Sequence, residues 1–158
     1  MAMRRSAGLV LYRRRDGGPE VFIGHMGGPF WAKKDEGAWS VFKGEYDETE
    51  DAFAAALREF EEETGQPPPD GPVIDLGEVR QSGGKRVVAW AVEGDFDPAE
   101  IKSNTYRVQW PPRSGQWRTF PEVDRAEWFD LDTARRKLVK AQSSFMDALE
   151  RELSAAGR

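Results

Sequence analysis

The segment from Asp47 to Thr64 constrains the fold more than any other part of the sequence, because it carries signals for both ends of a helix. Gly65 follows it, where a helix favours a left-handed residue, and the prolines at 67–69 prevent the helix from continuing. At the other end, Asp47 and Glu50 have the spacing of a capping box. We therefore predict a helix over residues 47–64.

The two sides of this predicted helix differ in chemistry. At about 100° per residue, Glu62 and Glu63 lie within about 60° of Glu59. The apolar residues Phe53, Ala56, Leu57 and Phe60 cluster about 110° from Glu59 and are expected to face the core. Neighbouring carboxylates repel one another, whereas a hard divalent cation such as Mg²⁺ binds them. The acidic side is therefore a candidate metal site, with a solvated helix face as the alternative.

Apolar segments bounded by turn residues predict strands on both sides of the helix. The predicted strands are Leu9–Tyr12 and Val21–Ile23, joined by a turn at 16–19, then residues 39–42, Val73–Arg80 paired with Arg86–Val92, and a short strand at Trp128–Phe129. Residues 104–128 are expected to be irregular, and Thr133–Leu153 a helix with a break near Ser143–Ser144. This order predicts an α/β fold in which helices cover a mixed sheet, with residues 1–158 forming a single domain.

Composition excludes several classes of function. The chain of 158 residues has no cysteine, which excludes a disulfide framework and a thiolate site. Its net charge of −5 argues against stable binding to nucleic acid or to a membrane surface. The apolar run at 7–12 is too short for a signal peptide or a membrane span. We therefore expect a cytoplasmic protein.

One spacing pattern in the chain resembles a known family signature. Seven residues stand at fixed intervals: Gly44, Glu50, Arg58, Glu59, Glu62, Glu63 and Gly65. This pattern resembles the Nudix box, the signature of the Nudix hydrolases. At residue frequencies of about 6 percent, a chance match is on the order of one in a hundred million per window or rarer. The resemblance implies an α/β/α sandwich and a metal-dependent hydrolase that cuts a pyrophosphate bond. Phe42 and Gln66 depart from the family pattern, at positions without a catalytic group.

The resemblance also implies roles for residues of the box. Glu59, Glu62 and Glu63 would hold Mg²⁺, or Mn²⁺ as the alternative, with the Gly44 carbonyl as a backbone ligand. For Glu59 the resemblance leaves two roles open, since it would ligate the metal or take a proton from the attacking water, and Arg58 would hold a glutamate by ion pairing. Glu59, Arg58 and Glu62 are thus the expected catalytic residues.

A further metal ligand is expected outside the box, as is common in the family. Glu122 is the first candidate, and Glu93 and Asp95 are the alternatives. His25 is the only histidine of the chain, and we expect it to have no catalytic role because the carboxylates already supply acid–base groups.

Substrate-binding residues are expected in two places. Trp39 and Lys43 precede the box, and Lys43 is a candidate phosphate contact. Residues 103–121 alternate aromatic side chains with arginines and include Tyr106, Arg113 and Trp117. Aromatic rings stack on bases and arginines bind phosphate, so this stretch is a candidate substrate loop. A purely structural loop is the alternative.

The C-terminal part of the chain suggests a substrate. Residues 126–131, followed by a helix, resemble the asymmetric diadenosine tetraphosphate hydrolases of the family, which predicts a dinucleoside polyphosphate as the small-molecule substrate. A tyrosine found about 17 residues after the box in some of these subgroups is absent, since Ser82 and Gly83 stand there. A nucleoside triphosphate, another nucleoside diphosphate-linked substrate, and a non-catalytic nucleotide-binding module therefore remain as alternatives. Many relatives dimerise, which leaves a homodimer open.

Overall fold

The structure is a computed structural model that describes residues 5–156. Its main sheet contains seven strands: β1 (Arg5–Arg15), β2 (Gly18–Met26), β3 (Trp39–Ser40), β4 (Phe42–Glu45), β5 (Val73–Arg80), β6 (Arg86–Glu93) and β9 (Val123–Asp130). The strand order is β3-β2-β1-β6-β5, with β4 beside β1 and β9 beside β2. The β1 and β6 strands are parallel and the other pairs antiparallel, which confirms the predicted mixed sheet.

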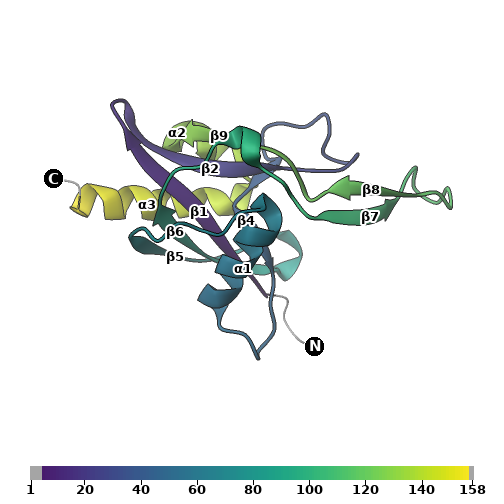
Figure 1. Cartoon of the computed structure of the whole chain (residues 1–158), viewed down its shortest axis with the longest axis horizontal. Helices are drawn as coiled ribbons and strands as arrows, with labels where there is room; N and C mark the ends of the chain where they lie inside the picture. Colours follow the sequence, from purple (N-terminus) through teal and green to yellow (C-terminus); the bar gives the residue numbers. More distant parts are fainter. Residues whose placement is uncertain (1–4, 157–158) are drawn as a thin grey trace.

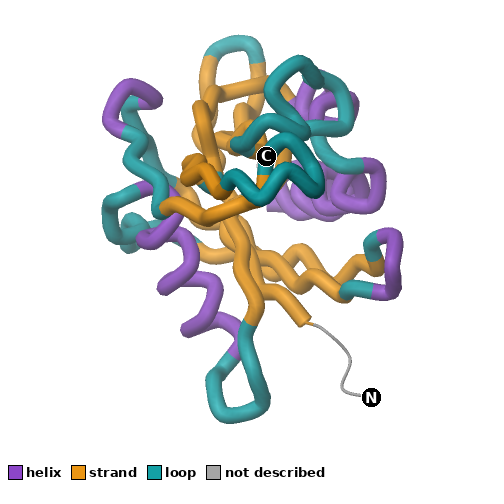
Figure 2. The backbone as a smooth tube through the Cα atoms, turned by 90° about the vertical axis from the view of Figure 1, so that its right-hand side faces the viewer, coloured by secondary structure: helices purple, strands orange, loops and turns teal. Residues whose placement is uncertain are grey.

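Helices cover both faces of this sheet, as Figure 2 shows. Leu9 and Leu11 of β1 point to the core beneath helix α1 (Ala52–Thr64), whereas Val10 and Tyr12 point to the core beneath α2 (Leu131–Lys137) and α3 (Ser143–Ala156). This alternation follows from the pleat of a strand that is buried on both sides. The α/β/α sandwich is confirmed.

Helix α1 begins later than the sequence indicates. Its N-cap is Asp51, whose carboxylate accepts a hydrogen bond from the Ala54 N–H, and not Asp47. Asp47 instead accepts hydrogen bonds from the backbone N–H and the hydroxyl of Thr49 in the preceding turn. The predicted start was wrong because both aspartates offer the same capping chemistry. The predicted end is confirmed, since Gly65 has a φ of 85° and caps the helix.

The predicted C-terminal helix is two helices. Leu138 leaves the helical conformation after α2 and its backbone pairs with Trp39. A short 3₁₀ turn at Lys140–Gln142 then leads into α3, so the break precedes Ser143. None of the helices within residues 5–156 has the length and apolarity that a membrane span requires.

The stretch predicted to be irregular contains a hairpin. Strands β7 (Thr105–Gln109) and β8 (Trp117–Pro121) form a separate two-stranded antiparallel sheet, which projects from the body of the molecule in Figure 1. The residues after it form the long strand β9, and not only the short strand predicted at Trp128–Phe129. The hairpin places Asn104 and Glu122 at its root.

Candidate active site

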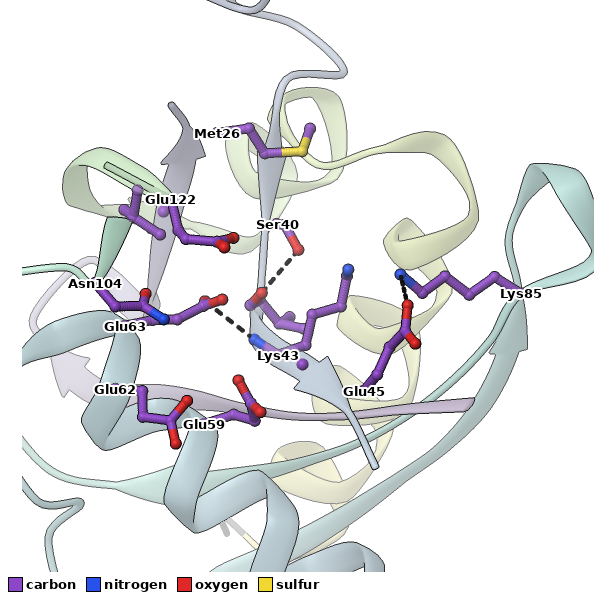
Figure 3. Close-up of a pocket in the computed structure, with 14 residues that line it drawn as sticks. Met26, Ser40, Lys43, Glu45, Glu59, Glu62, Glu63, Lys85, Asn104 and Glu122 are labelled. Atoms are coloured by element: carbon purple, nitrogen blue, oxygen red, sulfur yellow. Dashed lines mark hydrogen bonds and ion pairs between the residues drawn. The ribbon is translucent and has the colours of Figure 1, made fainter. Parts of the chain in front are cut away.

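A cavity of about 400 Å³ lies between α1, β4 and the root of the β7–β8 hairpin (Figure 3). It brings together six residues predicted from the sequence: Lys43, Gly44, Glu59, Glu62, Glu63 and Glu122. Four of the six are glutamates, and three of these come from two successive turns of α1. The predicted carboxylate side of the helix therefore faces a cavity and not open solvent alone.

Gly44 allows the Glu59 carboxylate to lie against the backbone of β4. A Cβ atom at position 44 would stand 1.9 Å from Glu59 Oε1 and 2.0 Å from its Cδ. No side chain fits at that distance, so the glycine creates the space that the carboxylate occupies. Burial, followed by repulsion from Glu62 and Glu122, raises the pKa of Glu59, although its hydrogen bond with Arg58 opposes that shift.

Arg58 holds three glutamates at once. Its Nε and Nη2 donate to the two carboxylate oxygens of Glu50 at 2.8 and 2.9 Å. Its Nη1 donates to Glu59 at 2.7 Å and to Glu62 at 3.1 Å. The planar guanidinium suits this arrangement because it presents five donors in a fixed geometry. Glu50 lies just before the helix, so it reaches across the first two turns to orient Arg58.

Glu63 is a buried carboxylate in the wall of the cavity. Its side chain accepts a hydrogen bond from the Lys43 backbone N–H at 3.2 Å, and the residue is 9% exposed. Burial raises the pKa of Glu63 to about 8, with contributions from the nearby charges of Glu122 and Glu59. The Lys43 ammonium opposes this shift. A cation entering the cavity would favour the ionised carboxylate.

Two lysines face the carboxylates across the cavity, as Figure 3 shows. Lys43 extends from β4 and Lys85 from the turn just before β6, and the Lys85 ammonium lies 3.6 Å from Glu45. Burial and the charge of Lys85 lower the pKa of Lys43. The sequence analysis missed Lys85, together with Met26, Ser40 and Asn104, which also line the cavity. Nothing local in the sequence marks these residues, since distant segments bring them to the cavity.

The candidate ligand outside the box lies on the cavity wall. Glu122 stands between β8 and β9, where its backbone pairs with Asn104 and Gly27. The alternatives Glu93 and Asp95 lie at a separate hollow beside Arg13–Arg15, and Asp95 forms an ion pair with Arg13 at 2.7 Å. The structure thus brings Glu122, but neither alternative, to the box.

Four residues predicted to bind substrate do not line this cavity. Trp39 is 1% exposed in the core beneath α2 and α3, and its indole N–H donates to Asp35 at 2.9 Å. Tyr106 uses its hydroxyl to donate to the Gly27 carbonyl at 2.8 Å, which attaches the hairpin to the body. Arg113 lies in the turn of the hairpin, and Trp117 on β8 is 56% exposed. Trp39 therefore serves packing, because its ring has no access to a substrate.

His25 is fully buried and has partners for both ring nitrogens. Nδ1 lies 2.9 Å from an Asp124 carboxylate oxygen, and Nε2 lies 2.6 Å from the Lys34 carbonyl. These contacts hold the 27–38 loop against β9. His25 does not line the carboxylate cavity.

The donor set of the cavity fits a hard divalent cation. Carboxylate oxygens are the ligands that Mg²⁺ and Mn²⁺ favour, and the Gly44 position is shaped to receive one of them. Within residues 5–156, no three acidic or histidine side chains already converge on one point. Arg58 engages one oxygen of Glu59 and one of Glu62, which leaves the other oxygen of each carboxylate as a possible metal ligand.

Comparison with known proteins agrees with this geometry. The Nudix domain family model matches residues 2–149, and the chain therefore belongs to the Nudix family. This membership supports a hydrolase that acts on acid anhydrides. No curated protein sequence matches the chain significantly.

Solved structures show the same fold. A Caenorhabditis elegans Ap4A hydrolase in a binary complex is 20% identical, with a TM-score of 0.67 and coverage of 97% of this chain and 99% of that chain. The NUDIX domain of Shewanella oneidensis NrtR, complexed with ADP ribose, is 17% identical, with a TM-score of 0.64 and coverage of 97% and 90%. A mutT/nudix family protein from Listeria innocua is 18% identical, with a TM-score of 0.63 and coverage of 99% and 98%.

Proposed function

We propose that this protein is a divalent-metal-dependent pyrophosphohydrolase that cleaves a phosphoanhydride bond in a nucleoside polyphosphate. The observation that carries this proposal is one cavity with four glutamates on one side and Lys43 and Lys85 on the other, where Glu45 accompanies Lys85. A polyphosphate suits both groups of side chains, because its oxygens can pair directly with the lysine ammonium groups and can share a metal ion with the glutamate carboxylates. A binding site for a neutral ligand would need neither.

Glu59, Glu62, Glu63 and Glu122 would hold Mg²⁺, or Mn²⁺, together with the carbonyl of Gly44. When bound, the metal neutralises phosphate oxygens and lowers the pKa of water. Lys43 and Lys85 would bind the phosphates on the opposite side of the cavity, because their ammonium groups line it. This arrangement fixes the polyphosphate chain between two walls of opposite charge.

Glu59 is the base that this proposal assigns. Its carboxylate is 11% exposed and its pKa is raised by burial, which makes it a better proton acceptor than an ordinary surface glutamate. The oxygen of a water molecule attacks phosphorus and the water proton passes to Glu59, while the bridging P–O bond breaks and the other phosphate group leaves with the bridging oxygen. Arg58 positions Glu59 and Glu62 through its hydrogen bonds and is itself oriented by Glu50.

A dinucleoside polyphosphate such as diadenosine tetraphosphate is the proposed substrate. The basic and aromatic hairpin supports this choice, since residues 105–121 contain three arginines and no acidic residue. The Arg107 guanidinium lies 5.3 Å from the Trp117 ring centroid, and Arg113 extends the basic surface to the turn. Such a surface suits the second nucleoside of the substrate, the one farther from the carboxylate cavity, and its phosphate. The similar fold of an Ap4A hydrolase agrees with this proposal.

A nucleoside triphosphate or another nucleoside diphosphate-linked compound is the alternative substrate. The Nudix domain that was solved with ADP ribose shows that the fold also accommodates such a ligand. A nucleotide-binding module without turnover is the alternative of another class. The presence of Glu59, Glu62 and Glu63 at the cavity favours the enzyme. A cytoplasmic location and a homodimer stay predictions from the sequence.

Hydrolysis of a substrate panel tests the proposal. The purified protein is incubated with Mg²⁺ and diadenosine tetraphosphate, nucleoside triphosphates, ADP-ribose or a nucleotide sugar, and the products are separated by ion exchange. We expect ATP and AMP from diadenosine tetraphosphate. Cleavage of another compound alone would replace the proposed substrate, and binding without any turnover would contradict the hydrolase and favour the binding module.

A further inference from the structure

A fifth glutamate, Glu45, lines the carboxylate cavity on the side of the two lysines. Glu45 and Lys43 stand two residues apart on β4, so the pleat of the strand directs their side chains to the same face of the sheet. The Glu45 carboxylate points toward Lys85, as Figure 3 shows, and lies 3.6 Å from its ammonium group. The proposed function assigns no role to this carboxylate, which would repel a phosphate and not bind it.

The contact between Glu45 and Lys85 contributes little to the fold. The Glu45 side chain is 54% exposed, and ion pairs with such access to water add little to stability because solvent screens them. The distance of 3.6 Å also exceeds that of an N–H···O hydrogen bond. Glu45 therefore leaves the N–H donors of the Lys85 ammonium group available to a phosphate, while its charge reduces the positive charge around them.

Glu45 changes the charge of the whole lysine side of the cavity. Two ammonium groups and one carboxylate leave a single net positive charge there. The influence of Glu45 extends to Lys43. Burial, followed by the charge of Lys85, lowers the pKa of Lys43, and the charges of Glu63, Glu122 and Glu45 oppose this shift.

The phosphates of a nucleotide differ in the charge that they bring to this side. A terminal phosphate carries about −1.5 to −2 at pH 7, because its second pKa is about 6. An internal phosphate of a polyphosphate chain has a single ionisable group and carries a single negative charge. The net positive charge of the lysine side balances an internal phosphate, whereas the additional charge of a terminal phosphate is repelled by Glu45.

We infer that Glu45 is a specificity-determining residue, which makes the lysine side of the cavity favour an internal phosphate over a terminal one. The inference rests on the proposed function, because it takes the phosphates of the substrate to contact Lys43 and Lys85. It gives a physical reason for a preference for dinucleoside polyphosphates, in which every phosphate is internal. A nucleoside triphosphate that binds with its terminal phosphate at Lys85 would face repulsion from Glu45.

A pair of nucleotides that differ in one charge tests the inference. ATP and its γ-methyl ester have the same base, sugar and number of phosphates, but the ester lacks the second negative charge on the last phosphate. Both are offered to the full chain with Mg²⁺ at pH 8. The ratio of their kcat/KM values measures the preference if they are hydrolysed, and the ratio of their calorimetric Kd values measures it if they are only bound.

We expect the wild type to favour the ester, and Glu45→Gln to lose about fivefold of this preference, the effect of one unit charge at about 4 Å in water. The change should come from the KM for ATP and not from kcat, since Glu45 acts on binding. Glu45→Asp keeps the charge and should keep most of the preference. Glu48→Gln is the matched control, because it removes the same charge from an exposed residue of the same segment outside the cavity. Circular dichroism verifies that each variant is folded.

The outcomes separate this inference from the proposed function. An unchanged ratio in a folded Glu45→Gln protein, or a wild type that favours ATP over the ester, would overturn the inference, and hydrolysis of any compound of the panel would still support the hydrolase. Failure of the wild type to bind the ester at millimolar concentration would likewise overturn it. A preference for the ester that depends on Glu45, in a protein that binds both nucleotides and hydrolyses nothing, would keep the role of Glu45 and remove the hydrolase.

Discussion

Replacing Glu63 by glutamine is expected to stabilise the metal-free protein at alkaline pH. The Glu63 carboxylate is buried and accepts from the Lys43 backbone N–H, and Glu59 and Glu122 add negative charge around it. Glutamine has nearly the same shape and keeps the accepting oxygen, but it cannot ionise. The substitution therefore removes the cost of a buried charge while the packing is retained.

The size and the sign of the effect follow from the pKa of Glu63, which folding raises from 4.5 to about 8. Between these two values the folded state binds more protons than the unfolded state, so the free energy of unfolding falls as pH rises. The gap of about 3.5 pKa units sets an upper limit of about 5 kcal/mol, at about 1.36 kcal/mol per unit. Local relaxation and water entry make the effect smaller than this limit. We expect the free energy of unfolding of Glu63→Gln to exceed that of the wild type by about 2 kcal/mol or more at pH 8.

Urea unfolding in EDTA, between pH 5 and 8.5, measures the effect. The wild type should lose stability across this range, whereas Glu63→Gln should lose less and become the more stable protein near pH 8. Glu61→Gln is the matched control, because Glu61 lies on the exposed side of the same helix and should follow the wild type. Adding Mg²⁺ should stabilise the wild type more than Glu63→Gln, since a ligand must be ionised to bind metal.

Parallel stability curves for the wild type and Glu63→Gln would refute this reasoning. They would mean that Glu63 ionises in the folded protein at its ordinary pKa, and that the carboxylate wall is more solvated than the structure indicates. If Mg²⁺ stabilised Glu63→Gln more than the wild type, that result would contradict the proposal that Glu63 is a metal ligand.

Three further substitutions probe the same region. Gly44→Ala should place a methyl group on the Glu59 carboxylate and lower kcat by about a hundredfold with an unchanged circular dichroism spectrum, since displacement of a catalytic group by about 1 Å has effects of this order. Arg58→Lys keeps the charge but loses the paired contact with Glu50, so activity should fall by about 10–100-fold in the same hydrolysis assay. Phe60→Ala removes a fully buried ring on the core side of α1 and should lower the free energy of unfolding in urea by about 3–5 kcal/mol.

The parts of the site that local sequence determines were predictable. The end of α1 at Gly65, its apolar side and the approach of Glu59, Glu62 and Glu63 to one cavity all follow from helical spacing within twenty residues. The start of the helix was not predictable, because Asp47 and Asp51 have the same capping chemistry and local sequence does not choose between them.

Features that depend on distant contacts could not be derived. Lys85 lies in the turn between β5 and β6 and reaches the cavity only because β6 pairs with β1, which also pairs with β4. Trp39 has the composition of a stacking residue, but its neighbours His25 and Phe129 enclose it in the core. The prolines at 111–112 suggested an irregular loop, whereas they lie in the turn of a hairpin whose strands pair on either side.

The most direct test of the central claim, that the carboxylates of α1 catalyse hydrolysis, compares Glu62→Gln with Glu61→Gln. Turnover of the compound that the wild type cleaves best is measured with Mg²⁺ at saturating substrate, on variants with wild-type circular dichroism spectra. The account predicts that Glu62→Gln loses about a hundredfold or more of kcat, since removal of one group that stabilises the transition state has effects of this order, and that Glu61→Gln keeps it. Full activity in a folded Glu62→Gln protein would contradict the account.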